Sequence, residues 1–284
     1  MDSPTSHIFF SQRLRLHYVD WGNAAAPPLL LIHGGRDHCR NWDWVARALR
    51  HKWHIIAPDL RGHGDSQWSI DDAYGSANMV YDLAQLIHQQ NLAPVSIISH
   101  SWGAAISLEY AGIFPENVRK LVAIEGLGLG RAADKSRDIA ERLRQWVSDE
   151  RALSGRMPRR YRSLEDAIAR MQEANGHLSP EQARYLTQHG VYQNEDGTYS
   201  WKFDNYVRSN EPIRLTREEV YALRGRIACP VLLVHGQESW AVNPDDVGIT
   251  KQFRDARVAS FAEAGHWVHH DQLEKFLACV QDFL

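Results

Sequence analysis

The sequence predicts an α/β fold in which helices flank a mostly parallel, twisted sheet. Three observations indicate it. Short apolar runs typical of buried strands recur at residues 29–32, 54–58, 95–98, 120–124 and 230–236, and a last strand is expected at 257–261. Segments with helical spacing of apolar residues separate the runs, and turns of small or polar residues follow them. Strands that alternate with helices predict a parallel sheet whose ligands bind at the carboxyl ends of its strands.

The remaining elements follow in chain order from the same patterns. Residues 7–20 alternate imperfectly and predict an opening antiparallel hairpin. Residues 41–50 and 76–91 carry apolar side chains on one helical face, and residues 104–110 have the composition of a helix. A final helix is expected over 272–284.

Between residues 127 and 226 the strand-like runs stop, and the chain becomes helical and charged. Helices are expected at 136–147, 164–175 and 179–188. We therefore divide the chain into a core of residues 1–126 and 227–284 and a helical cap of residues 127–226.

One turn has the character of a nucleophile site. Ser99-His100-Ser101-Trp102-Gly103 lies between a predicted strand and a predicted helix. A serine at the apex of such a sharp turn exposes its hydroxyl at the positive end of the new helix. The pattern is G-x-S-x-G with Ser99 in place of the first glycine.

Two further loops strengthen this interpretation. His33-Gly34-Gly35 follows the strand at 29–32, and residues 59–66 read D-L-R-G-H-G-D-S. With the turn at Ser101, they make the sequence resemble the α/β-hydrolase superfamily, whose members often carry D-x-R-G-x-G-x-S in this loop. The resemblance implies an α/β-hydrolase fold, and backbone N–H donors for an oxyanion from Gly35 and Trp102. In the 59–66 loop, Asp59 and Arg61 are expected to be structural.

The base expected from the resemblance is His266, which follows the last predicted strand in the turn Ala264-Gly265-His266. The catalytic acid is harder to assign, because the position after the strand at 231–234 that usually holds an aspartate holds Ser239. Glu125, which directly follows an earlier buried strand, is favoured. Glu238 is the alternative acid, with Asp245 or Asp246 as further candidates.

Together these residues form the set needed for acyl transfer. We expect a serine hydrolase acting on a hydrophobic carboxylic ester or lactone through an acyl-enzyme, and within the superfamily the sequence is most similar to the serine-hydrolase-like branch of the esterases. Aspartate in place of Ser101 would have predicted haloalkane or epoxide chemistry. Two alternatives stay open: hydrolysis of a carbon–carbon bond in a diketone from aromatic breakdown, and a ligand-binding protein that kept the fold.

Tryptophans stand beside the expected nucleophile and base and after the usual acid position. Trp102, Trp240 and Trp267 therefore predict an aromatic substrate pocket, to which Trp42, Trp44 and residues 201–206 of the cap would add. Arg36, next to Gly35, is the candidate to meet a substrate carboxylate, with a salt bridge to Asp37 or to the cap as the alternative.

Composition bounds the partners. The chain has 284 residues and a net charge of −3, without runs of like charge that would indicate nucleic acid or a membrane surface. The N-terminus lacks the pattern of a signal peptide, so a cytoplasmic monomer or homodimer with a small-molecule substrate is expected. The three cysteines lie far apart in the sequence, so they predict no metal site. The run His269-His270-Asp271 lacks metal-ligand spacing, and neither a metal nor a cofactor is expected.

Overall fold

The computed structural model describes residues 3–71, 73–127, 138–209, 213–245 and 248–284, and its main element is an eight-stranded sheet with the order β1-β2-β4-β3-β5-β6-β10-β11. All neighbouring strands in the part β4-β3-β5-β6-β10-β11 pair in parallel. Strand β2 pairs antiparallel with both β1 and β4. The predicted α/β fold with a mostly parallel sheet is therefore confirmed. The strands are β1 (Thr5–Ser11), β2 (Leu14–Asp20), β3 (Pro28–Ile32), β4 (His54–Pro58), β5 (Val95–His100), β6 (Val118–Ile124), β10 (Val231–Gly236) and β11 (Ala256–Phe261).

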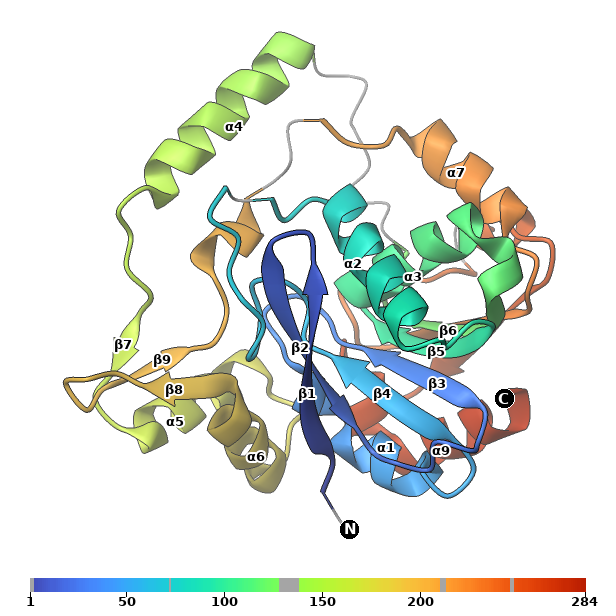
Figure 1. The fold of residues 1–284 in the computed structure, drawn as a ribbon, viewed down its shortest axis with the longest axis horizontal. Helices are drawn as coiled ribbons and strands as arrows, with labels where there is room; N and C mark the ends of the chain where they lie inside the picture. The colour runs from blue at the N-terminus through green and yellow to red at the C-terminus, as the bar shows by residue number, and fades with distance from the viewer. Residues whose placement is uncertain (1–2, 72, 128–137, 210–212, 246–247) are drawn as a thin grey trace.

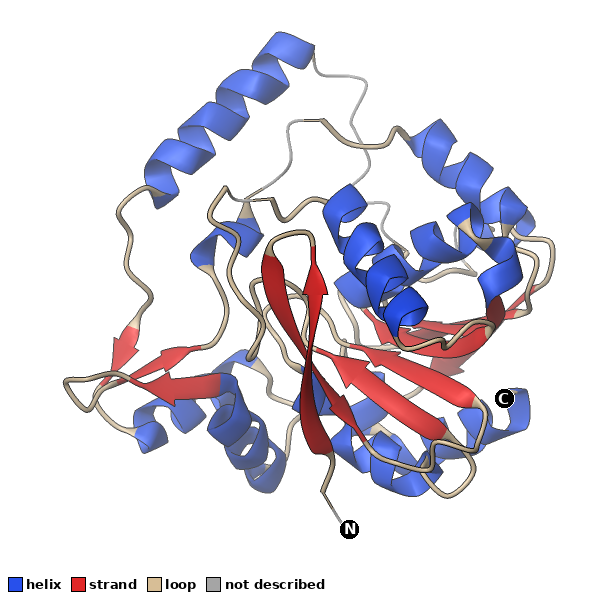
Figure 2. Ribbon diagram, in the orientation of Figure 1, coloured by secondary structure: helices blue, strands red, loops and turns tan. Residues whose placement is uncertain are grey.

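Helices cover both faces of this sheet, which Figure 2 shows as a twisted layer between them. On one face lie α2 (Ser76–Gln89) and α3 (Trp102–Ile113), and on the other α1 (Asp43–Leu49) and α9 (Leu273–Phe283). The sheet has one hydrophobic core on each face, and strand β3 shows how a single strand contributes to both. Leu30 and Ile32 pack with the α2 and α3 side, whereas Leu29 and Leu31 pack with the α1 and α9 side. Every residue from Leu29 to Ile32 is therefore buried, as a continuous apolar run requires.

The segment between β6 and β10 forms the helical insertion, and it also contains a small sheet that the sequence did not predict. Its helices are α4 (Ile139–Leu153), α5 (Leu164–Ala174), α6 (Pro180–Gly190) and α7 (Arg217–Arg226). Strands β7 (Arg160–Tyr161), β8 (Val191–Gln193) and β9 (Tyr199–Trp201) form an antiparallel sheet. Strands of two or three residues are too short to show an alternating pattern, so sequence periodicity could not reveal them. The first two residues of the helix expected at 136–147 lie outside the described residues.

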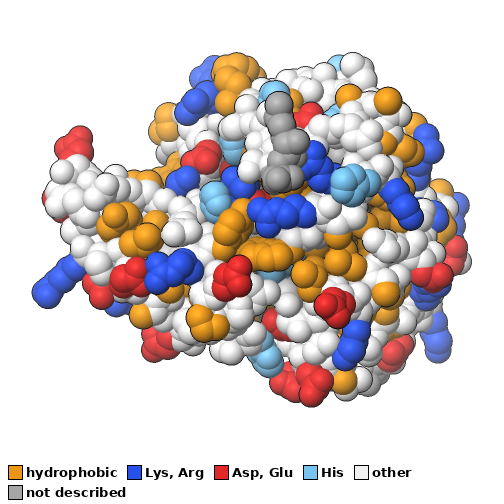
Figure 3. Space-filling model, turned by 90° about the horizontal axis from the view of Figure 1, so that it is seen from below, with side chains coloured by type: hydrophobic (Ala, Val, Ile, Leu, Met, Phe, Trp, Pro, Cys, Tyr) orange, Lys and Arg blue, Asp and Glu red, His pale blue; other side chains and the backbone are white. Residues whose placement is uncertain are grey.

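In Figure 1 the helices α5 and α6 and the small sheet form a lobe at the left of the molecule, and α4 lies at the top. The lobe also stands out at the left of Figure 3. The last helix of the insertion, α7, packs directly on α3 of the core. A Cβ added to Gly112 of α3 would lie 2.5 Å from the carbonyl oxygen of Leu223 in α7. The boundary between core and cap at residues 126 and 227 stays a prediction.

The surface seen in Figure 3 carries Lys and Arg side chains interspersed with Asp, Glu and hydrophobic ones. Within the described ranges, none of the helices combines the length and the apolar character that crossing a bilayer requires.

Candidate active site

Ser101 lies at the turn between β5 and α3, with backbone angles φ 51° and ψ −117°. This conformation is costly for a residue with a side chain, and such strain is found mostly at functional sites. Two glycines allow the turn to pack closely. A Cβ on Gly103 would lie 2.3 Å from the carbonyl oxygen of His33, and one on Gly126 would lie 2.1 Å from that of Ser101. The sharp turn predicted around Ser101 is thus present.

Ser99 fits the position where the usual pattern has glycine. Its side chain is fully buried, and its hydroxyl donates to the carbonyl oxygen of Val122 on the neighbouring strand β6, at 3.2 Å. The departure from the usual pattern therefore leaves no polar group unsatisfied at this position.

Ser101, His266 and Glu125 form a continuous line of contacts. The hydroxyl of Ser101 lies 2.9 Å from His266 Nε2, and His266 Nδ1 lies 3.3 Å from Glu125 Oε2. A neutral His266 with its proton on Nδ1 donates to the carboxylate and accepts from the serine. The three residues come from the ends of β5, β11 and β6, which meet at one edge of the sheet.

Glu125 has a fully buried side chain whose oxygens face several donors. Oε1 accepts from the N–H of Gly236 at 2.6 Å and lies 2.9 Å from His235 Nδ1. Oε2 accepts from the hydroxyl of Ser239 at 2.5 Å. Ser239, which occupies the usual acid position, therefore supports a carboxylate that comes from the neighbouring strand.

Of the other candidate acids that the structure describes, neither Glu238 nor Asp245 forms a hydrogen bond or an ion pair with His266. The Glu238 side chain is 54% exposed, and its carboxylate lies 3.7 Å from His177 Nε2. Asp245 is exposed, and Asp246 lies outside the described residues. Of the predicted acids, the geometry places Glu125 beside the imidazole.

The loop after β3 lies against this turn. A Cβ on Gly34 would be 3.0 Å from the Ser101 Cβ, and one on Gly35 would be 3.4 Å from the Trp102 ring. Trp102 is the first residue of α3, and the first amides of a helix have no acceptor within it. Gly35 and Trp102 thus lie beside Ser101, and their role as oxyanion donors stays a prediction.

A cavity of about 1320 Å³ brings the predicted site residues together. Its lining includes Gly35, Arg36, Ser101, Trp102, Glu125, Glu238, Trp240, His266 and Trp267. Trp240 is 82% exposed and stacks on His266, with ring centroids 4.6 Å apart. Trp42 is instead fully buried against His269, and Trp44 contacts Tyr185 and His270, so the suggestion that these two line the pocket is wrong.

Two histidines of the site were not predicted from the sequence. His235 lies beside Glu125, and His100 donates from Nε2 to the carbonyl oxygen of His266 at 2.8 Å. Burial lowers the pKa of His100 well below its usual value, so this side chain stays neutral. His100 stands inside the turn pattern, which was the available signal. His235, at the end of a buried strand, offered none beyond its position.

The histidines after His266 also have partners within the protein. His269 and His270 both donate from Nε2 to Asn41 Oδ1, at 2.6 and 3.1 Å. Asp271 Oδ2 accepts from the N–H of Gly265 at 2.8 Å. These contacts fix the turn that carries His266 and its short helix α8 (Val268–Asp271).

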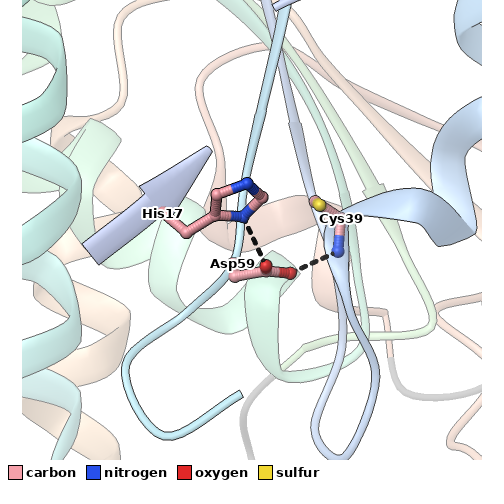
Figure 4. A group of neighbouring side chains, drawn as sticks. All are labelled: His17, Cys39 and Asp59. Carbon is pink, nitrogen blue, oxygen red and sulfur yellow. Dashed lines mark hydrogen bonds and ion pairs between the residues drawn. The ribbon is translucent and has the colours of Figure 1, made fainter. Parts of the chain in front are cut away.

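His17, Cys39 and Asp59 form the one group of metal-ligand types that lie close together in the described part of the chain (Figure 4). Asp59 accepts from His17 Nδ1 and from the N–H of Cys39, both at 2.7 Å, and from the N–H of Asp65 at 2.9 Å. Burial alone would raise the pKa of Asp59, but the hydrogen bond and charge of His17 lower it below the ordinary value. Burial raises the pKa of the Cys39 thiol well above its usual range. The hydrogen bonds of Asp59 therefore connect β2, the loop after β4 and the segment before α1.

Comparison with known proteins agrees with this architecture. Residues 27–273 match the family model described as alpha/beta hydrolase fold. The chain is 24% identical over 275 residues to a serine hydrolase-like protein of Danio rerio, covering 93% of this chain and 83% of that protein. It is 25% identical to a 2-hydroxy-6-oxo-2,4-heptadienoate hydrolase of Pseudomonas putida, covering 95% and 91%.

Among solved structures, the thioesterase domain from the curacin biosynthetic pathway superposes with a TM-score of 0.87 at 22% identity, over 99% of each chain. That likeness shows the shared fold. With the family match over most of its length, the chain belongs to the alpha/beta hydrolase superfamily.

Proposed function

We propose that the protein is a serine hydrolase that cleaves a carboxylic ester or lactone with a hydrophobic part, through an acyl-enzyme. The observation that carries the proposal is the line of contacts from Ser101 through His266 to Glu125, at the wall of the cavity. A serine hydroxyl needs a base to become a nucleophile, and the base needs a fixed tautomer.

In the reaction, Ser101 Oγ attacks the substrate carbonyl carbon while His266 Nε2 takes the hydroxyl proton. The carbonyl oxygen gains negative charge and accepts from the N–H groups of Gly35 and Trp102. The bond to the leaving oxygen then breaks, and His266 returns its proton to that oxygen. Water attacks the acyl-serine, His266 accepts a proton from it, and Ser101 regains its proton as the acid departs.

The tryptophans support a hydrophobic substrate. Trp102 and Trp267 line the cavity near the nucleophile, and Trp240 lies over the His266 ring. Such a wall offers a large apolar surface to an alkyl or aryl group. A short polar substrate would not cover this apolar surface, which would stay exposed to water.

A fluorophosphonate probe tests the nucleophile, because it forms a bond with an activated serine. We expect labelling of the wild type at Ser101, no labelling of Ser101→Ala, and a loss of at least ~10³-fold in kcat for both Ser101→Ala and His266→Ala. Circular dichroism verifies that the variants fold. An unlabelled wild type would favour the ligand-binding protein on this fold instead.

Hydrolysis of a carbon–carbon bond is the second candidate, favoured by the similarity to the Pseudomonas putida hydrolase over 95% of the chain. It would use the same Ser101, His266 and Glu125. A panel of esters, lactones, thioesters and vinylogous diketones, assayed with wild type and Ser101→Ala, separates the two. Turnover of the diketones alone would replace the ester proposal.

A further inference from the structure

Arginine side chains outnumber carboxylates in the cavity wall. Among the described residues that line it, five are arginines: Arg36, Arg156, Arg159, Arg170 and Arg208. The lining carboxylates are Glu125, Glu238 and Asp271. The cavity therefore carries an excess of positive charge, which favours negatively charged ligands.

The carboxylates do not neutralise these arginines, because they belong to the surroundings of His266. Glu125 accepts from Ser239 and Gly236 and contacts His266, and Asp271 accepts from Gly265. Glu238 faces His177. Of the arginines, Arg170 has its own partner, Glu173, at 2.7 Å.

Arg36 and Arg208 approach the cavity from different segments. Arg36 directly follows Gly35 in the loop after β3, whereas Arg208 ends the short helix Asn205–Arg208 of the insertion. Burial lowers the pKa of Arg36, and the charge of Arg208 lowers it further. Both side chains also line the same cavity, so their positive charges face one ligand space.

Neither arginine forms an ion pair with a carboxylate in the part of the chain that the structure describes. The neighbouring Asp37, the expected alternative partner of Arg36, is buried and accepts instead from the N–H of His38 at 2.8 Å and from Asn41 Nδ2 at 2.5 Å. Arg208 lies 5.8 Å from the centre of the Phe203 ring. Both charged heads therefore remain available to a ligand.

The backbone of Arg36 adds an independent observation. Its φ of 62° lies in the left-handed region, where glycine would be favoured over a long side chain. An arginine held there costs stability, and a functional role for its side chain would explain why it is present.

From these features we propose that Arg36 and Arg208 bind an anionic group of the substrate, a carboxylate, sulfate or phosphate, while the apolar wall holds the rest. This inference rests on the proposed hydrolase function and narrows it to amphiphilic esters or lactones that carry a negative charge. Guanidinium groups suit all three anions, because their donors match pairs of oxygens.

The test compares two aryl esters of the same shape, a glutarate monoester with a free carboxylate and its monoamide. The readout is the ratio of their kcat/KM values, so that a general loss of activity cancels. We expect the wild type to favour the anionic ester by about tenfold or more, as one or two charge-assisted hydrogen bonds would provide. The ratio should fall toward one in Arg36→Gln and Arg208→Gln, and Arg36→Lys should restore part of it.

Arg257→Gln is the matched control, since this arginine pairs with Asp282 on the surface and does not line the cavity. It should keep the wild-type ratio. Equal ratios in the wild type and Arg36→Gln would overturn the proposal.

A binding measurement keeps the subsite testable if no ester is turned over. Quenching of tryptophan fluorescence in Ser101→Ala would report binding of 4-phenylbutyrate, its amide, and a sulfate and a phosphate of similar length. Tighter binding of one anion than of the amide, lost in Arg36→Gln, supports the subsite and identifies the anion. Equal binding of the amide and of all three anions rejects it, whereas failure of the fluorophosphonate label rejects only the hydrolase function.

Discussion

Glu125 is a buried carboxylate held by groups from two strands. Its own strand β6 ends at Ile124, and its φ of 55° turns the side chain into the site. The N–H of Gly236 and the hydroxyl of Ser239, both from the β10 side, donate to its two oxygens. Because a buried charge needs such donors, the position after β10 contributes a hydrogen bond to the carboxylate that contacts His266.

Replacement of Glu125 should separate the two candidate acids. Glu125→Gln removes the charge that stabilises a protonated His266, so we expect kcat to fall by about 10²-fold to 10⁴-fold. Glu238→Gln changes an exposed side chain of the same type and serves as the control, with a loss below about threefold. Steady-state kinetics with an aryl ester measures both, and the opposite ranking would transfer the role to Glu238.

A carboxylate at position 239 should partly replace the one at 125. In Glu125→Gln/Ser239→Asp the new side chain starts from the residue whose hydroxyl already lies 2.5 Å from Glu125 Oε2. We expect kcat of this double variant to exceed that of Glu125→Gln by about tenfold. Glu125→Gln/Ser239→Asn, which has the same shape without the charge, should show no recovery. Equal rates for the two double variants would argue against a movable acid position.

The sequence predicted Ser101, His266 and Glu125, because each follows a recognisable strand and a turn pattern surrounds the first two. It could not predict that Ser239 and His235 would contact Glu125. These contacts depend on the pairing of β6 with β10, more than 100 residues apart in the chain, and no local pattern encodes that distance.

At the scale of elements, polar contacts tie the insertion to the core. Helix α6 contributes Tyr185, whose hydroxyl donates to Asp43 of α1, and the carbonyl oxygen of Leu186, which accepts from His38 Nε2 at 2.9 Å. Lys202 of the insertion pairs with Asp65 at 2.7 Å. The main strands and helices were predictable from apolar periodicity. These docking contacts and the small sheet were not, because single polar residues and very short strands carry no periodicity.

Tyr185→Phe tests this docking. The change deletes a hydroxyl that donates to the buried Asp43 and accepts from Arg40 Nη2 at 3.0 Å. We expect the free energy of unfolding to fall by about 1–2 kcal/mol, because a hydrogen bond to a charged group contributes more than a neutral one. Urea denaturation measures the change. The matched control is Tyr192→Phe in β8, an exposed tyrosine whose loss should cost less than about 0.5 kcal/mol.

Across the whole molecule, buried histidines link the stability of the fold to pH. Five of them lie in the core with pKa values lowered by burial: His33, His38, His100, His269 and His270. The pKa falls to about 4 for His33 and to about 3 for His270. These side chains are neutral in the folded protein at neutral pH, and several of them hold the loops around the site.

The sign of the pH effect follows from proton binding. An unfolded histidine has a pKa of about 6.5, so below that pH the unfolded chain binds more protons than the folded one. The free energy of unfolding should therefore be nearly constant from pH 8 to 7. It should then decrease as the pH falls from about 6.5 toward 4, by up to ~1.4 kcal/mol per pH unit for each histidine that stays neutral. Burial also raises the pKa of Asp37 and of Asp271, which act in the opposite sense, but these are two groups against five.

Urea denaturation at pH 8, 7, 6 and 5 measures this dependence, and His270→Gln identifies its source. Glutamine preserves a donor toward Asn41 Oδ1, which His270 Nε2 contacts at 3.1 Å, but it cannot take up a proton. The variant should lose less stability between pH 7 and 5 than the wild type, by about the contribution of one histidine. His51→Gln, at an exposed position, should leave the pH dependence unchanged. Equal stability of the wild type at pH 7 and 5 would show that protonation of the core histidines does not limit the fold.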